Sequence, residues 1–376
     1  MNKTKVLHVA NMVGGVEICV RQIINNIDNS KIESLIASQC LKEKEELLSN
    51  DKMQIKSFKI SITRNVNLFR DLICLLQLLR IIHLEKPSLI HAHSAKAGFL
   101  CRILSNFTKT KVFYTPHAFS FLSANNKFLK NLYLIIERLS ISKNTILIAT
   151  SKSEQNLAIE KVGYKRNKTI LLNNSIKIKT TPKSKSRFTN NLDNYICTVA
   201  RPSFQKNLKM MVNAFKIVSE KDNNIQLFII GAGEYSPQKQ QLQSQISKMN
   251  LEDRITVLPW IPREEVQKIL ITSKLYVSTS LYEGLPYSVL ESMRYKIPSV
   301  LTNTFGNRDL LVNNKTGFLV ELNDVQDMAE KILILINDKP KRKIFGENAK
   351  KLLYDKYNFN DYIFKLTNLY TTSFKY

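Results

Sequence analysis

The feature that most constrains the fold is a regular alternation of short apolar runs with longer runs in which apolar residues recur at helical spacing. The short runs at residues 5–10, 88–93, 111–115 and 145–150 are typical of buried strands, and the longer runs between them are typical of amphipathic helices. Strands that alternate with helices predict parallel sheets covered by helices. We therefore expect an α/β chain.

The alternation stops between residues 176 and 194, where Lys, Ser, Thr and Asn gather, and it restarts afterwards. Such a stretch is typical of a linker. A length of 376 residues also suggests two domains. We predict an N-terminal domain over residues 1–185, a second domain over 186–360 and a C-terminal helix over 361–376.

The charge of the chain is its most unusual bulk property. The sequence holds 56 basic and 31 acidic side chains, a net charge of +25, and residues 1–185 carry +18 of it. A basic excess favours an anionic partner, such as lipid, nucleic acid or a phosphorylated substrate. A genome biased toward Lys, Asn and Ile would produce a similar excess without any such partner.

The cysteines and the N-terminus bear on the compartment. Five cysteines are spread widely with no CxxC pair, which excludes a disulfide framework and fits a reducing cytoplasm. The first residues lead straight into a strand-like run, so we expect no signal peptide. No run of about 20 apolar residues is present, so we expect no membrane span.

Two segments suggest anion binding. Gly14 and Gly15 lie between a predicted strand and a predicted helix, a turn that suits a phosphate contact and a plain tight turn equally. Arg201 and Lys206 follow another predicted strand at the opening of a helix. Ligands of open α/β sheets bind at the carboxyl ends of strands, although the same two cations also fit a solvated helix start.

The segment from Glu283 to Glu291 is the most informative one. It follows a predicted strand, turns at Gly284-Leu285-Pro286 and enters a helix, which places Glu283 on the loop and Glu291 about two turns into the helix. Two carboxylates at one crevice can accept hydrogen bonds from the hydroxyls of a polar ligand. Backbone amides at 286–288 are expected to form a further anion cradle.

Three histidines are candidates for chemistry in the first domain. His117 follows a predicted strand, where a single histidine is more often structural than catalytic. His91 and His93 alternate on another strand, but no carboxylate or cysteine lies near them in sequence, so we expect no metal site. The chain also lacks an Asp-x-Asp motif, so a divalent ion held on that motif is not expected.

These segments together resemble the retaining glycosyltransferases of family 4, which have the two-domain GT-B architecture. The most specific part is Glu-x7-Glu at Glu283 and Glu291. The supporting segments occur in the expected order over nearly the whole chain: MVGGVE (12–17), HAHSAKAGFL (91–100), YTPHAFSF (114–121), VARPSFQKN (199–207), FIIGAGE (228–234) and the GNRDLL…TGFLV run (306–320).

The resemblance implies two Rossmann-like domains that face each other across a cleft, with C-terminal helices that cross back to the first. It implies an acceptor-binding first domain and a second domain that binds a nucleotide sugar, with UDP as the expected nucleotide and no metal or other cofactor. Arg201 and Lys206 would hold the donor diphosphate in place of a metal, with Gly14 and Gly15 on its other side.

The remaining implied roles concern the sugar and the nucleoside. Glu283, with the amides around Leu285, Pro286 and Tyr287, would bind hydroxyls of the donor sugar, and His117 would lie near the reacting carbon. Glu291 would bind the ribose. The base would pack around Trp260 and Ile261.

The resemblance further implies a glycan acceptor, linked to a polyprenyl diphosphate, in the synthesis of a bacterial surface polysaccharide. Such an acceptor places the enzyme on the cytoplasmic face of the plasma membrane. Residues 96–111 and 119–130 mix aromatic and basic side chains, so we predict an anionic membrane surface as a partner there. The apolar half of each segment also fits a plain core role.

Two other functions remain open at this stage. A nucleotide-sugar epimerase of GT-B shape would share the architecture, although the Glu-x7-Glu and Arg/Lys pairs favour transfer. A nucleic-acid-binding protein would explain the charge, but no reading motif and no basic stretch interleaved with exposed aromatics supports it. We therefore expect nucleic acid not to be a partner.

Overall fold

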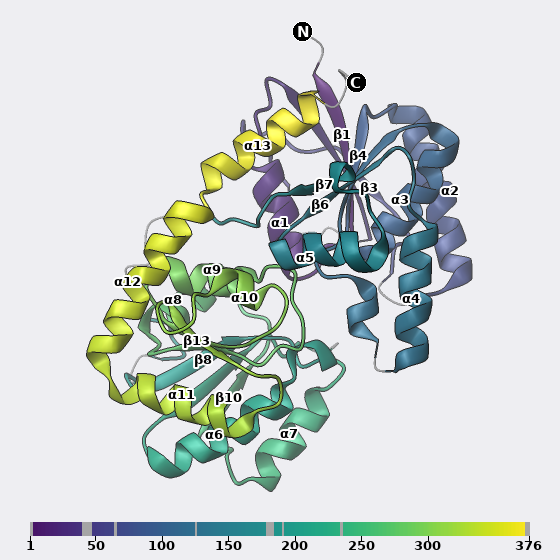
Figure 1. Ribbon diagram of the computed structural model, residues 1–376. Helices are drawn as coiled ribbons and strands as arrows, with labels where there is room; N and C mark the ends of the chain where they lie inside the picture. Colours follow the sequence, from purple (N-terminus) through teal and green to yellow (C-terminus); the bar gives the residue numbers. More distant parts are fainter. Residues whose placement is uncertain are drawn as a thin grey trace. The chain divides into compact units, whose positions relative to one another are not determined.

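A computed structural model describes residues 3–39, 47–63, 66–124, 126–177, 184–189, 192–233 and 236–372. The chain divides into two compact units, one of residues 1–177 with 359–376 and one of residues 178–358 (Figure 1). The first division falls inside the predicted linker 176–194, parts of which, 178–183 and 190–191, lie outside the described residues. Which unit binds acceptor and which binds donor stays a prediction.

The first unit is built on a parallel sheet in the order β3-β2-β1-β4-β5-β6-β7. Its core strands are almost wholly buried, as expected for a sheet covered on both faces. The strands are β1 (Thr4–Ala10), β2 (Ile32–Ser38), β3 (Ser57–Lys59), β4 (Leu89–His93), β5 (Lys111–Thr115), β6 (Thr145–Ala149) and β7 (Thr169–Leu171).

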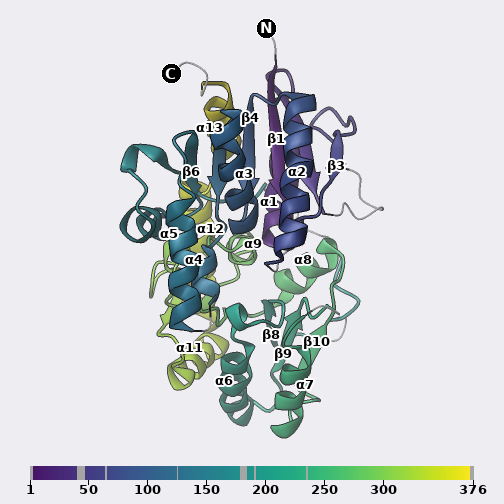
Figure 2. The same ribbon diagram turned by 90° about the vertical axis from the view of Figure 1, so that its right-hand side faces the viewer.

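Helices cover both faces of this sheet. The helices α2 (Leu68–Glu85), α3 (Ala95–Thr108) and α4 (Lys127–Leu139) lie side by side on one face (Figure 2). The helices α1 (Gly15–Ile24) and α13 (Phe359–Thr372) lie on the other face, where α13 packs on β1 and β2 (Figure 1). The helix α5 (Lys152–Leu157) continues as a π-helical turn over Ala158–Val162.

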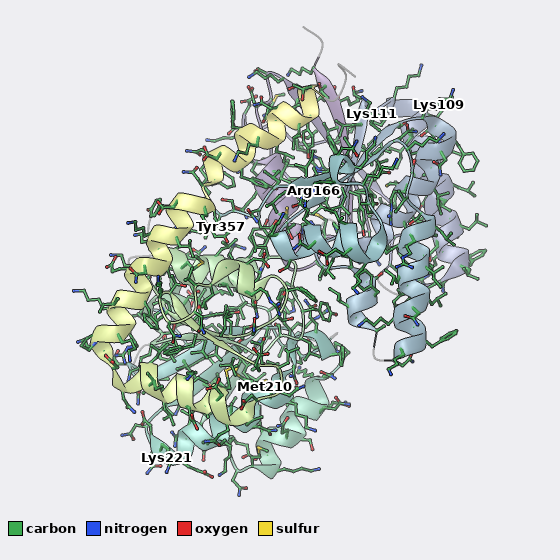
Figure 3. The ribbon with its side chains drawn as sticks, viewed as in Figure 1. Lys109, Lys111, Arg166, Met210, Lys221 and Tyr357 are labelled. Atoms are coloured by element: carbon green, nitrogen blue, oxygen red, sulfur yellow. The ribbon has the colours of Figure 1, made fainter. Side chains whose placement is uncertain are left out.

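The second unit repeats the plan with a parallel sheet in the order β10-β9-β8-β11-β12-β13. Its apolar core lies between the sheet and the helices α6 and α11, and Met210 of α6 is labelled in Figure 3. The strands are β8 (Tyr195–Val199), β9 (Gln226–Ile230), β10 (Ile255–Leu258), β11 (Tyr276–Ser278), β12 (Ser299–Thr302) and β13 (Gly317–Val320). The helices are α6 (Leu208–Lys221), α7 (Lys239–Lys248), α8 (Arg263–Thr272), α9 (Tyr287–Arg294), α10 (Asn307–Leu310), α11 (Val325–Asn337) and α12 (Lys339–Lys356).

The prediction of two α/β domains with parallel sheets is confirmed. The short strands β7 and β13, at the edges of their sheets, were not predicted. The helix α5 is capped at its start by Ser151. The Ser151 hydroxyl accepts from the Glu154 N–H at 3.1 Å, but the Glu154 carboxylate turns to other donors.

The predicted membrane segments 96–111 and 119–130 are partly core. Leu100, Leu104, Phe119 and Phe121 are buried, because α3 and the turn after β5 pack them inward. Among the residues that the structure describes, no helix is both long enough and apolar enough to span a bilayer.

Candidate active site

The strand order reverses between β1 and β4 in the first unit and between β8 and β11 in the second. Loops that leave adjacent strands on opposite sides of such a reversal open a crevice at the carboxyl ends of the strands, where ligands of doubly wound sheets bind. In the second unit, Arg201 follows β8 and the 279–286 loop follows β11. Arg201, Lys206 and Glu283 therefore belong to the loops at its switch point.

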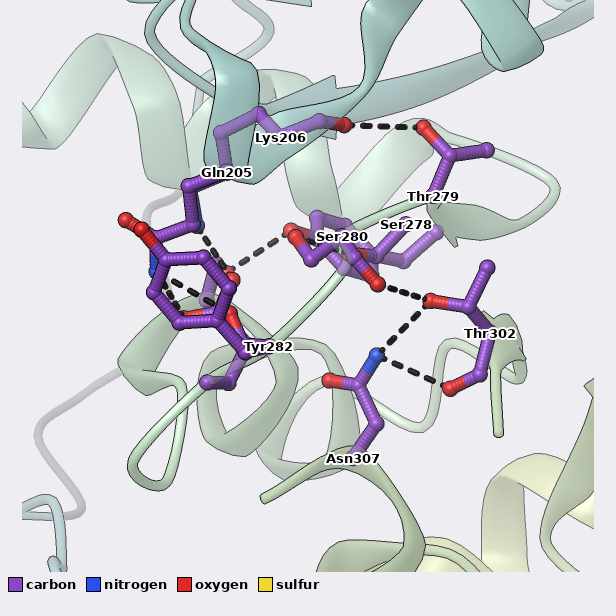
Figure 4. Close-up of polar contacts among 11 residues, drawn as sticks. Gln205, Lys206, Ser278, Thr279, Ser280, Tyr282, Thr302 and Asn307 are labelled. Carbon is purple, nitrogen blue, oxygen red and sulfur yellow. Dashed lines mark hydrogen bonds and ion pairs between the residues drawn. The ribbon is translucent and has the colours of Figure 1, made fainter. Parts of the chain in front are cut away.

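The structure brings Lys206 and Glu283 into direct contact. The Lys206 ammonium lies 2.6 Å from Glu283 Oε1, and the Gln205 amide donates to Glu283 Oε2 at 3.2 Å. The Glu283 side chain is almost fully buried and that of Lys206 is one-fifth exposed. Gln205, which was not among the predicted site residues, thus orients the carboxylate together with Lys206. Figure 4 labels Gln205 and Lys206.

Polar contacts fix the backbone of both loops. The Thr279 hydroxyl donates to the carbonyls of Lys206 and Asn207 at 3.0 Å, and the Leu281 N–H donates to the Gln205 carbonyl at 2.8 Å. Figure 4 shows the Thr279 contact beside the Ser280–Thr302–Asn307 hydrogen bonds that hold the next loop. Lys206 and Glu283 are therefore placed by rigid loops.

Gly306 allows the next loop to approach Glu283 closely. Its φ is +82°, and a Cβ atom there would lie 2.8 Å from the Glu283 carbonyl oxygen. The Glu283 N–H donates to the Phe305 carbonyl at 3.0 Å. A side chain at residue 306 would displace the loop that carries Glu283.

Glu291 lies within α9, as predicted, and is buried. Its Oε1 lies 2.5 Å from the guanidinium of Arg263, which the sequence analysis did not single out and whose side chain is 43% exposed. Burial raises the pKa of Glu291, while Arg263 and Arg294 act in the opposite direction. Arg263 thus compensates a carboxylate that would otherwise be costly to keep ionised in the interior.

Trp260 and Ile261 follow β10, as predicted, and the indole is half exposed. It packs on Gly233, where a Cβ atom would lie 2.4 Å from the ring. An exposed indole face against a glycine is able to stack on a planar ring.

The turn before α9 corrects one expectation. Leu285 and Tyr287 are buried and Pro286 caps the helix without a side-chain hydrogen bond. Because Pro286 carries no backbone N–H, only Tyr287 and Ser288 of the predicted 286–288 cradle carry a donor.

In the first unit, Gly14 is the N-cap of α1 and Gly15 is its first residue. Gly14 has φ +60° and ψ −130°, a conformation that side chains disfavour, and a Cβ atom there would meet nothing within 4 Å. The turn is thus an open backbone surface at the switch point of the first sheet. Its predicted approach to Arg201 and Lys206 involves both units and stays a prediction.

His117 follows β5 with a left-handed backbone of φ +52°, and Ala118 continues with φ +82°. The buried Glu154 holds this turn, because its carboxylate accepts from the Ala118 N–H at 2.7 Å and from the Thr150 N–H at 2.7 Å. Burial lowers the pKa of His117 to about 4, so its half-buried ring is neutral at physiological pH.

His117 is the outer end of a chain of imidazoles. Its Nε2 lies 3.3 Å from His93 Nδ1, and His93 Nε2 lies 3.2 Å from His8 Nδ1. His91, next to His93, contacts the Tyr370 hydroxyl of α13 at 2.5 Å and the Thr115 hydroxyl at 2.9 Å. Burial lowers the pKa of His93 and His91 well below the ordinary value.

The expectation of no metal site at His91 and His93 stays a prediction, although the fold brings a cysteine close to His93. The side chain of Cys19 comes from α1, and its sulfur lies within 4.8 Å of ligand atoms of His93 and His117. His8, His91 and His93 form a second group of this kind. Neutral imidazoles and a cysteine are ligands that suit zinc. Cys19 is distant in sequence, so no local motif points to it.

Comparisons with known proteins identify the family. The sequence model of a family described as "Glycosyltransferase Family 4" matches residues 13–179, and that of "Glycosyl transferases group 1" matches residues 180–352. The chain belongs to the family 4, group 1 glycosyltransferases. This glycosyltransferase is 27% identical to an Escherichia coli UDP-Gal:alpha-D-GlcNAc-diphosphoundecaprenol alpha-1,3-galactosyltransferase, over 98% of this chain and 97% of the relative.

Other relatives and solved structures agree. The capsular polysaccharide biosynthesis glycosyltransferase CapM of Staphylococcus aureus is 25% identical, over 88% of this chain and 90% of the relative. The structure of Anabaena HepE in complex with UDP and glucose has a TM-score of 0.80 at 19% identity, over 97% of this chain and 98% of that one. A sucrose-phosphate synthase from Thermosynechococcus elongatus has a TM-score of 0.86 at 16% identity, over 99% and 100%. The fold is therefore that of the GT-B glycosyltransferases.

Proposed function

We propose that this glycosyltransferase moves a sugar from a UDP-sugar to a polyprenyl-diphosphate-linked glycan during synthesis of a bacterial surface polysaccharide. We further propose that it retains the anomeric configuration and needs no metal. The names of the E. coli and S. aureus relatives support the reaction and its pathway, and the UDP complex of HepE supports the nucleotide.

In the second unit, we propose that Arg201 and Lys206 hold the donor diphosphate and stabilise the charge of the departing UDP. Glu283 binds hydroxyls of the sugar, beside the turn of Leu285, Pro286 and Tyr287. Glu291 binds the ribose. The base stacks around Trp260 and Ile261.

In the first unit, Gly14 and Gly15 contact the diphosphate through the open backbone of their turn, and His117 lies near the reacting carbon. Its ring is neutral, so it is suited to hydrogen bonding rather than to supplying a positive charge.

The observation that carries the proposal is the contact between Lys206 and Glu283. A cation for phosphate and a carboxylate for hydroxyls stand 2.6 Å apart at the switch point of one sheet, as a phosphorylated sugar requires. When the donor binds, its diphosphate replaces Glu283 as the partner of the ammonium, and the carboxylate turns to the sugar.

Replacing Lys206 by Ala is expected to lower kcat/KM at least 100-fold, because one preorganised charge at a leaving group contributes roughly 3–4 kcal/mol. The measurement is UDP release from UDP-galactose, UDP-glucose and UDP-N-acetylglucosamine with a polyprenyl-linked acceptor, in EDTA. Lys209→Ala, an exposed lysine of α6, is the matched control. Unchanged turnover in Lys206→Ala would contradict the role of the ammonium. Loss of activity in EDTA would contradict metal independence. An inverted anomeric carbon in the product would contradict retention.

We also propose that the first unit binds an anionic membrane surface through the outer faces of α2 and α4. Four of the outward-facing apolar residues of each helix recur every three or four positions, which forms one stripe on each helix. They are between 39% and 84% exposed, and they are Leu68, Leu72, Leu76 and Leu79 of α2 and Phe128, Leu132, Ile135 and Leu139 of α4.

Cations accompany these stripes. Lys127 and Lys130 of α4 are exposed, as is Lys109 at the end of α3, which is labelled in Figure 3. Apolar stripes beside cations suit the headgroup region of an anionic leaflet. This surface differs from the one predicted in 119–130, of which Phe128, Lys127 and Lys130 remain exposed.

Replacing Phe128 and Leu139 together by Ser is expected to weaken binding to phosphatidylglycerol vesicles at least tenfold, because roughly 1.5–3 kcal/mol of apolar transfer is lost per side chain that inserts fully. Vesicle co-sedimentation measures it, with Leu322→Ser in the second unit as the control. Binding is also expected to fall between about 0.1 and 0.5 M salt, since exposed cations are screened. Binding that neither the variant nor salt weakens would contradict this surface.

A further inference from the structure

The chain of imidazoles from His117 through His93 to His8 has a direction. A neutral imidazole carries one N–H, so each ring can donate one hydrogen bond and accept one. The two contacts, 3.3 Å between His117 Nε2 and His93 Nδ1 and 3.2 Å between His93 Nε2 and His8 Nδ1, can therefore be satisfied in two ways only. All protons point toward His117, or all point toward His8.

The inner end of the chain distinguishes the two directions. His8 Nε2 is buried and has no hydrogen-bond partner among the described residues. If the protons pointed toward His8, this atom would be a buried N–H without an acceptor. If they point toward His117, it is a lone pair without a donor. Orphaned buried N–H groups are rarer than under-satisfied acceptors, so the second direction is favoured.

We propose that His8 and His93 are positioning residues that hold His117 in the neutral tautomer protonated at Nδ1. His8 donates from Nδ1 to His93 Nε2, and His93 donates from Nδ1 to His117 Nε2. The Nε2 lone pair of His117 is then occupied, and Nδ1–H is the hydrogen-bonding group that remains for a ligand.

His91 does not set the direction of this chain. Its two ring nitrogens contact the hydroxyls of Tyr370 and Thr115, and each hydroxyl can act as donor or acceptor. The His91 ring can therefore adopt either neutral tautomer without losing a hydrogen bond. The direction depends on His8, whose unpartnered nitrogen makes one arrangement more costly.

The consequence for catalysis rests on the proposed function. A fixed Nδ1–H is a donor, so His117 recognises an oxygen of the donor sugar or of the leaving phosphate and cannot accept a proton from the acceptor hydroxyl at that nitrogen. This assigns His117 the work of a hydrogen-bond donor and excludes it as the general base in this tautomer.

The test uses the full chain labelled with ¹⁵N-histidine, in which two-bond proton–nitrogen correlations separate the two neutral tautomers. The sequence has five histidines, and the exposed His83 serves as the reference ring because His83→Gln removes only its own signals. The signals of His117 and His93 are assigned with His117→Gln and His93→Leu. We expect the His117 ring to be protonated at Nδ1 in the wild-type protein, and protonation at Nε2 would overturn the proposal.

A matched pair of variants separates positioning from plain structure. In His93→Asn, the amide nitrogen occupies about the place of Nδ1 and can still donate to His117. In His93→Leu it cannot. We expect the Nδ1–H tautomer of His117 to persist in His93→Asn and to be lost in His93→Leu. Equal tautomers in both folded variants would overturn the role of His93.

UDP release adds a second, independent readout. We expect it to fall about tenfold in His93→Leu and to be rescued in His93→Asn, the effect of about one hydrogen bond on the barrier. If the wild-type protein consumes no UDP-sugar, the proposed function fails, while the tautomer measurement still tests the direction of the histidine hydrogen bonds. If the enzyme is active but His117 is protonated at Nε2, only the proposal about these hydrogen bonds fails.

Discussion

Lowering the pH from 8 to 5 is expected to destabilise the first unit by several kcal/mol, a large part of the stability of an ordinary domain. The cause is the buried histidines. Burial lowers the pKa of His8 to about 3 and holds those of His91 and His93 well below the ordinary 6.5. Each ring that stays neutral in the folded protein but takes up a proton when unfolded lowers the free energy of unfolding by about 2 kcal/mol between pH 8 and pH 5.

The direction follows from the sign of the shift. Because the folded pKa values are depressed, the stabilisation is complete above pH 6.5 and declines as the pH falls toward the folded values. The titratable groups that contact these rings do not reverse this loss of stability at low pH. His117 is lowered in the same direction, and the pKa of Tyr370 is raised, away from this range.

The second unit provides an internal comparison. All five histidines of the sequence lie between residues 8 and 117, so the second unit has none. Its buried Glu291 has a raised pKa, so falling pH relieves rather than adds cost there. We therefore expect the first unit to unfold at a higher pH than the second.

Urea unfolding at pH 8, 6.5 and 5, followed by hydrogen exchange, measures the two units separately. Trp260, the single tryptophan, reports the second unit by fluorescence. His8→Leu is expected to remove about 2 kcal/mol of the loss at pH 5 and His83→Gln none of it. A first unit whose stability does not change between pH 8 and 5 would contradict this account.

Replacing Glu137 by Ala is expected to lower the free energy of unfolding by about 3–5 kcal/mol, because it leaves a buried guanidinium without a counter-charge. Arg102 of α3 is wholly buried, and its guanidinium lies 2.7 Å from the Glu137 carboxylate of α4. Arg102 also donates to the Tyr164 hydroxyl at 2.9 Å, and the Tyr114 hydroxyl donates to Glu137 at 3.0 Å. These contacts join α3, α4 and β5 in one polar cluster.

The cluster behaves as a unit, so the double variant is the informative one. Burial alone lowers the pKa of Arg102, but the neighbouring Glu137, Tyr164 and Tyr114 more than offset this and raise it, so the guanidinium stays charged. Arg102→Met with Glu137→Leu removes both charges and is expected to recover part of the loss. Thermal and urea unfolding at pH 8 measure this, with the exposed Arg138→Ala as the control. A double variant as unstable as Glu137→Ala would show that packing, not charge, holds these helices.

The sequence determined the plan of both sheets and the place of the main site. Parallel strands buried on both faces appear as continuous apolar runs, and the helices between them repeat at their own period, so residue order alone predicts the alternation. The same order puts Glu283 before α9 and Glu291 within it, and Arg201 after β8. The edge strands β7 and β13 were not predicted.

Only the tertiary structure decided what those side chains contact. Gln205 and Arg263 reach Glu283 and Glu291 across 78 and 28 residues of sequence, and His8 reaches His93 across 85. Neighbouring strands of a parallel sheet meet only after a crossover, so such contacts leave no local pattern. The exposure of the apolar stripes of α2 and α4 could not be predicted either. The sequence of an amphipathic helix shows which residues share a face, but it does not show whether another element packs on that face.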